Sequence, residues 1–148
     1  MSAQQTSKPI ELDYATPVPR KATAPWMLWT GRILSTLIVL FMLMDGVMKL
    51  IKPQFVVEAT TKLGYPESSI RPIGAAALAG AILYAIPQTS VLGAILLTGF
   101  LGGAVATHVR AGEQSYVFAI VFGIVTWLGI YLRDARLRRL TPLRQLPA

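Results

Sequence analysis

The stretch WTGRILSTLIVLFMLMDGVMKLI, residues 29–51, decides the fold. Residues 33–44 carry no charge, and at 1.5 Å rise per residue about 20 apolar residues cross the roughly 30 Å hydrocarbon core of a bilayer. The run continues through Asp45 and Lys49 without the small-residue cleavage site that would end a signal peptide. We therefore predict a membrane-spanning helix over about residues 29–51.

Three further apolar runs follow this helix in the 148-residue chain. Each is close to spanning length, and they cover about residues 70–86, 90–108 and 116–132. Only Pro87, Gln88 and Thr89 separate the second predicted helix from the third, so these two helices must form an antiparallel hairpin. The sequence therefore predicts an all-α fold, an integral membrane four-helix bundle.

The segments around the spans complete the predicted domain organisation. Residues 53–64 place apolar side chains on one face between a proline and a glycine, which favours a short helix lying in the membrane interface. The four-helix domain then covers residues 26–132. A flexible polar N-terminal tail precedes it at residues 1–25, and a basic cytoplasmic tail follows at residues 133–148.

Composition excludes several classes of protein. The chain is 53% hydrophobic and 14% charged, with a mean hydropathy of +0.54, which is too apolar for a soluble domain and makes the lipid bilayer its first partner. The net charge of +7 therefore does not indicate a nucleic-acid-binding surface, and no nucleic acid is expected as a partner. Without cysteine and with one histidine, neither a metal site nor an intrinsic cofactor is expected.

The distribution of basic residues predicts the orientation in the membrane. With the N and C termini cytoplasmic, nine of the 14 Lys and Arg residues lie on the inner side, as the positive-inside rule favours. Aromatic residues at the same ends of the spans are expected to form an interfacial belt; they are Trp26, Trp29, Tyr84, Trp127 and Tyr131.

Several motifs together resemble the DoxX-like family of small four-helix membrane proteins. They are FMLMDGVMKL (41–50), LGYP (63–66), VLGAILL (91–97), GGAVATHVR (102–110) and LRDARL (132–137). The resemblance implies a multi-pass protein of the bacterial cytoplasmic (inner) membrane. Founding relatives of that family are subunits of a membrane thiosulfate:quinone oxidoreductase, whereas most members have no assigned activity. The resemblance therefore implies a fold more firmly than a reaction.

Charged residues at one end of the predicted spans form the candidate polar pocket. Asp45 and Lys49 are four residues apart on one helix face, in the favourable order for an ion pair. The predicted topology brings His108, Arg110 and Glu113 to the same, outward-facing side. These five residues could hold a quinone headgroup or a small polar ligand and exchange protons. In the alternative interpretation, the pair only fixes the rotation of its helix, and His108 caps helix carbonyls.

Small residues predict where helices pack. Gly74 and Gly80 belong to a run of small side chains on the second predicted span, and Gly99 with Gly103 forms a GxxxG pattern on the third. We expect these two faces to meet inside one bundle, with a homodimer interface as the alternative.

Three functions remain open. The first is an accessory subunit of a quinone-linked membrane redox system, which requires a redox-protein partner because the chain lacks its own redox centre. The second is a small transporter, which requires a homo-oligomer because four helices are few for alternating access. The third is a non-catalytic membrane scaffold or assembly factor. The protein is not expected to be an enzyme on its own, although it fits an oxidoreductase subunit.

Overall fold

The computed structural model describes residues 24–140, which are helical throughout apart from short connections and contain no strand. Four helices are long and apolar enough to cross a membrane. They are α1 (Pro25–Ile51), α3 (Ile70–Ala85, extended by the 3₁₀ turn η1 at Glu67–Ser69), α4 (Ser90–Arg110) and α5 (Tyr116–Arg133). The shorter α2 (Gln54–Lys62) and α6 (Ala135–Leu140) complete the described chain. The predicted all-α four-helix membrane fold is confirmed within this range.

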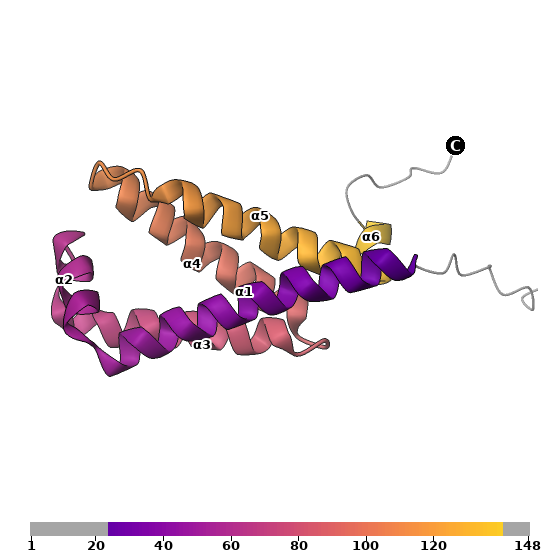
Figure 1. The fold of residues 1–148 in the computed structure, drawn as a ribbon, viewed down its shortest axis with the longest axis horizontal. Coiled ribbons are helices and arrows are strands. Elements are labelled where there is room, and N and C mark those ends of the chain that lie inside the picture. The colour runs from indigo at the N-terminus through magenta and orange to yellow at the C-terminus, as the bar shows by residue number, and fades with distance from the viewer. Residues whose placement is uncertain (1–23, 141–148) are drawn as a thin grey trace, which may run out of the picture.

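The four long helices pack in a ring. Helix α1 contacts α3 and α5, and α4 contacts the same two helices from the other side. In Figure 1, the α1–α3 pair and the α4–α5 pair lie together at the α6 end and diverge toward α2. We call the end where the two pairs lie together the closed end and the end where they diverge the open end, and α2 lies across the open end.

Glycines allow the close approach at the closed end. A Cβ on Gly31 of α1 would lie 2.9 Å from the carbonyl oxygen of Gly129 on α5. A Cβ on Gly93 of α4 would lie only 2.2 Å from the backbone nitrogen of Tyr84 on α3. Small residues at such contacts let helix backbones pack by dispersion where lipid offers no hydrophobic driving force. These contacts hold α1 to α5 and α3 to α4 at the closed end.

A buried hydrogen-bond network ties three helices together at the same end. The Tyr84 hydroxyl donates to the Thr126 carbonyl oxygen at 2.7 Å, so its 3.1 Å bond with Ser35 is donated by the serine hydroxyl. Arg133 donates to the Tyr84 carbonyl at 2.8 Å and lies over the Tyr84 ring. Tyr84 is fully buried, so its expected place in an interfacial belt is wrong. Its polar tip reaches protein partners inside the bundle, as buried tyrosines usually do.

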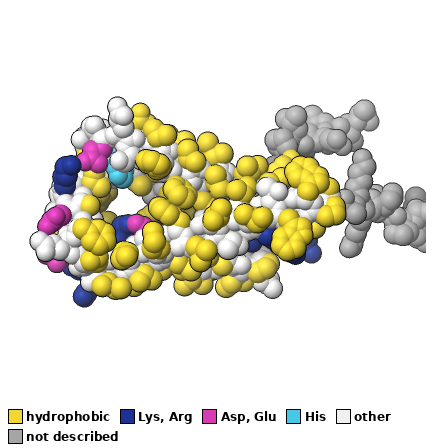
Figure 2. Space-filling model, viewed as in Figure 1, with side chains coloured by type: hydrophobic (Ala, Val, Ile, Leu, Met, Phe, Trp, Pro, Cys, Tyr) yellow, Lys and Arg dark blue, Asp and Glu magenta, His cyan; other side chains and the backbone are white. Residues whose placement is uncertain are grey.

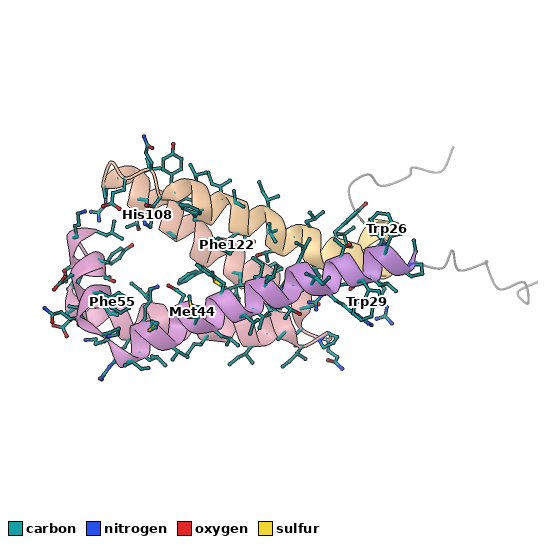
Figure 3. The ribbon with its side chains drawn as sticks, in the orientation of Figure 1. Trp26, Trp29, Met44, Phe55, His108 and Phe122 are labelled. Carbon is teal, nitrogen blue, oxygen red and sulfur yellow. The ribbon has the colours of Figure 1, made fainter. Side chains whose placement is uncertain are left out.

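The outer surface is apolar along the length of the bundle. Large hydrophobic side chains of α1, α4 and α5 are exposed, and they cover most of the face shown in Figure 2. Trp26 and Trp29, both about two-thirds exposed, lie at the closed end (Figure 3). An apolar surface of this extent needs lipid around it. The structure thus agrees with a multi-pass membrane protein.

Helix boundaries differ modestly from those expected. Helix α1 begins at Pro25, four residues before the expected start, because proline suits the first helical position. The basic tail expected at 133–148 contains α6, which sequence reasoning missed. The Asp134 carboxylate starts that helix by accepting the Arg136 backbone N–H at 2.8 Å. Residues 1–23 and 141–148, which include most of both expected tails, lie outside the described residues.

Candidate functional site

The open end of the bundle contains a cavity of about 520 Å³, which we call the chamber. Helices α1, α3 and α4 form its walls and α2 covers it. Figure 2 shows the hollow at this end, with the histidine on one edge and basic and acidic side chains on the other. In Figure 3, His108 on α4 and Phe55 on α2 lie at this same end. The chamber is lined by Asp45, Lys49, Phe55, Val56, Ala59, Thr60, Leu63, Tyr65, Ile73, Gly99, Phe100, Gly103, Ala104, Thr107 and His108.

A second cavity of about 540 Å³, which we call the window, adjoins the chamber. It lies between α1, α4 and α5 and is bordered by four phenylalanines. The two cavities share five lining residues, which are Asp45, Lys49, Phe100, Ala104 and His108. The ionisable side chains therefore stand where the two cavities meet.

Asp45 and Lys49 form an ion pair on α1. Their spacing of four residues places both side chains on the helix face that lines the cavities. The side chains remain 28% exposed for Asp45 and 18% exposed for Lys49. Glycine on α3 makes room for this arrangement, because a Cβ on Gly74 would lie 2.7 Å from the Lys49 Cβ. The expected pair is thus present and half-buried, with a cavity on its open side.

His108 contributes the titratable group of α4. Its Nδ1 lies 2.8 Å from the carbonyl oxygen of Ala104, one turn earlier on the same helix. Because a carbonyl oxygen only accepts hydrogen bonds, Nδ1 must carry the proton. This fixes Nε2 as the nitrogen that accepts a proton or a hydrogen bond in the neutral ring and donates one in the charged ring. The carbonyl that Nδ1 contacts lies inside α4, whereas the last carbonyls of the helix accept backbone N–H groups of residues 111–113, so the bond does not cap the end of the helix.

Arg110 and Glu113 do not line either cavity. Arg110 donates to the Leu63 carbonyl oxygen at 2.9 Å, and Glu113 pairs with Lys62 at 3.2 Å. Both interactions connect the end of α2 to the end of α4 and the loop after it. The five residues expected to converge thus divide into three at the cavity and two that hold its cover.

Sequence reasoning missed three polar residues of the chamber, Thr60, Tyr65 and Thr107. The Thr107 hydroxyl donates to the Gly103 carbonyl at 2.9 Å, so in its 2.7 Å bond with Tyr65 the tyrosine hydroxyl is the donor. This bond joins the connector after α2 to α4. Hydroxyl side chains are common on helices and in connectors, where they bond to nearby backbone groups, so nothing in the sequence pattern distinguished these three.

The expectation that Gly99 and Gly103 pack against the second span is wrong. A Cβ on either glycine would meet no atom within 4 Å, and both residues line the chamber. Gly80 of α3 instead packs against Leu97 of α4, and Gly74 packs against α1. The helices have already diverged at the level of Gly99 and Gly103, so the small residues there leave space instead of closing it.

Metal ligands are not grouped in this part of the protein. Among residues 24–140, no three His, Cys, Asp or Glu side chains lie close enough to hold a metal ion. The polar groups at the junction of the cavities are one carboxylate, one ammonium and one imidazole. They can bind an organic headgroup through hydrogen bonds and exchange protons with it.

Comparison with known proteins identifies the family. A sequence model of the DoxX-like family matches residues 33–129. The chain belongs to the DoxX-like family. The match includes every residue that lines the chamber and the window of this DoxX-like protein. No curated protein and no solved structure matches the chain.

Proposed function

We propose that this DoxX-like protein is an accessory subunit of a quinone-linked redox system in the bacterial inner membrane, with both termini in the cytoplasm. It holds a quinone headgroup in the chamber, and a partner protein carries the redox centre. The observation that supports this best is the presence of Asp45, Lys49 and His108 at the junction of two otherwise mostly apolar cavities. Ionisable groups at membrane depth are costly, and they commonly belong to ligand or proton sites.

The residues present fit a quinone. A quinone accepts two electrons and two protons to become a quinol, so its site needs hydrogen-bond donors for the oxidised form and acceptors for the reduced form. The Lys49 ammonium has three N–H donors, and the ion pair with Asp45 does not use all of them, so Lys49 can also donate to a quinone oxygen. His108 Nε2 donates when the ring is charged and accepts when it is neutral. The chamber volume of about 520 Å³ also falls in the range of sites for small organic ligands.

The electrons must come from the partner. The chain contains no cysteine and a single histidine, so the two electrons of each reduction are supplied by a redox protein docked to it. The two protons come from water, and His108 is the side chain that delivers them at the junction of the cavities. The role of the chain is therefore to bind, to orient and to supply protons.

The transporter alternative has less support from the geometry. Alternating access requires a path to the opposite side of the membrane. At the closed end, Ile38, Tyr84, Leu97 and Ile130 are all at most 1% exposed. Opening that end would require the tightest helix contacts of the bundle to separate. The scaffold alternative, in turn, gives the charged pair only the structural role of fixing the rotation of α1 and gives no role to the cavity beside it.

Quinone content after purification tests the proposal. The protein is purified in mild detergent, and bound quinone is extracted and quantified by mass spectrometry per folded protein. We expect near-stoichiometric quinone in the wild type and at least a tenfold loss in Asp45→Asn and in His108→Ala. Glu67→Gln is the matched control, because it makes the same carboxylate-to-amide change in an exposed pair with Lys52 outside the cavities. Equal quinone content in all four proteins would contradict the proposal.

A further inference from the structure

The chamber and the window differ in chemistry. Beyond the residues that they share, the chamber adds three hydroxyl side chains, Thr60, Tyr65 and Thr107, and it lies under α2. The window adds Phe41, Phe118 and Phe122 and only one polar side chain, Ser115. One compartment is therefore suited to a polar group and the other to hydrocarbon. This division matches the two parts of an amphiphilic molecule.

The window opens sideways between two spans. Phe118 of α5 is 71% exposed and Phe41 of α1 is 38% exposed, so the bordering rings reach the outer surface of the bundle. Phe41 and Phe122 stack with their ring centroids 4.2 Å apart. This pair is where α1 and α5 come back into contact, and it forms the boundary of the window toward the closed end. Because both helices are spans, the opening faces lipid.

We propose that the chamber and the window are two parts of one binding site for a membrane amphiphile. The headgroup occupies the chamber beside Asp45, Lys49 and His108, and the hydrocarbon tail leaves through the window between α1 and α5. This inference rests on the proposed function and names the route and orientation of its ligand. The ligand enters and leaves sideways, from the bilayer, and the phenylalanines guide its tail.

The tail gains little affinity from the window in a membrane. Hydrocarbon that moves from lipid to an apolar groove stays in a similar environment, so the tail sets the direction of binding more than its strength. Changing the tail should therefore alter the dissociation constant in a bilayer only slightly, so the informative measurement is the position of the tail.

Photo-cross-linking locates the tail. The full chain in nanodiscs is irradiated with a decyl-benzoquinone that carries a diazirine at the end of its tail, and labelled residues are mapped by mass spectrometry. Labelling of lipid-facing residues persists with excess unlabelled decyl-benzoquinone, whereas labelling of the site is competed. We expect competed labels on the window residues Phe41, Ser115, Phe118 and Phe122, and their loss in His108→Ala. Competed labels on α2 or on Ile73 would overturn this inference and leave the proposed function intact, whereas no competed label anywhere would count against both.

A steric block gives a second measurement. The chain has no cysteine, so single cysteines can be coupled to a bulky maleimide in detergent before reconstitution. Coupling at Phe118→Cys should reduce the competed labelling at least tenfold. Val121→Cys is the matched control, because Val121 lies one turn further along α5, is 50% exposed and lines neither cavity. Equal labelling in the two blocked proteins would show that the tail does not use the window.

Discussion

Under the proposed function, the substitution Gly103→Leu should exclude the quinone headgroup from the chamber without disturbing the fold. Gly103 lines the chamber, and a Cβ there would meet no atom within 4 Å. Leucine side chains on a helix point toward the preceding turn, where Gly99 also leaves open space. The Cβ of the added side chain therefore has open space, and the rest of the side chain extends into the cavity.

The expected loss of affinity follows from the size of the headgroup. A quinone ring with its two carbonyl oxygens has about eight non-hydrogen atoms, and ligands of moderate size gain about 0.3 kcal/mol per atom. Removing these contacts costs about 2.4 kcal/mol, which raises the Kd about 50-fold. Equilibrium binding of radiolabelled decyl-benzoquinone to the protein in nanodiscs measures this change.

Gly102→Leu is the control for this experiment. Gly102 is adjacent on α4, also has open space at its Cβ position, and lines neither cavity. Both variants gain the same helix propensity of about 0.8 kcal/mol, so that effect cancels in the comparison. An unchanged Kd in a Gly103→Leu protein that unfolds at the same temperature as Gly102→Leu would refute the reasoning.

Light scattering in detergent checks the alternative in which Gly99 and Gly103 form a homodimer interface. In that case Gly103→Leu would lower the molecular mass of the particle.

Three other predictions concern packing, charge and topology. Gly93→Ala should destabilise the bundle by about 3 kcal/mol in denaturant unfolding, because the added Cβ would lie 2.2 Å from the backbone of α3. A free energy of unfolding equal to that of Gly102→Ala would contradict this. Asp45→Asn or Lys49→Met alone should cost about 3 kcal/mol by the same measurement, and the double variant should recover most of it because no charge is left unpaired; additive losses would disprove the coupling. In intact cells, a membrane-impermeant maleimide should label Ser68→Cys, whereas Gln88→Cys should react only after permeabilisation, because η1 is expected outside and the α3–α4 turn inside; the reverse pattern would invert the proposed orientation.

Hydropathy and local spacing made much of the fold predictable. The runs near residues 29–51 and 116–132 exceed or approach spanning length on their own, and the turn between α3 and α4 is too short for anything but a hairpin. The Asp45–Lys49 pair was predictable because the four-residue spacing brings both side chains together on any helix. These features depend only on residues that are neighbours in the sequence.

Features that depend on the angle between helices were not predictable. Gly99 and Gly103 look like a packing motif, but the helix pairs diverge before that level and the glycines line a cavity. Tyr84 has the position of an interfacial aromatic residue, yet its hydroxyl reaches Ser35 and Thr126 across the bundle. In both cases the role of the residue is set by a helix that is distant in sequence, and no local sequence pattern encodes the tilt of that helix.

The closed end also determines how the site experiences the electrical potential of the membrane. The fully buried Tyr84 and Thr126, together with Ser35, lie between the cavities and the α6 end. Under the proposed function, the protons that His108 delivers to the quinone therefore come from the face of the bilayer at the open end, and they leave as part of the neutral quinol. A charge that crosses 100 mV changes in free energy by about 2.3 kcal/mol, and here no charge makes that crossing. Quinone reduction with a partner on that same face would then be electroneutral, and its rate should be the same in energised and de-energised membranes.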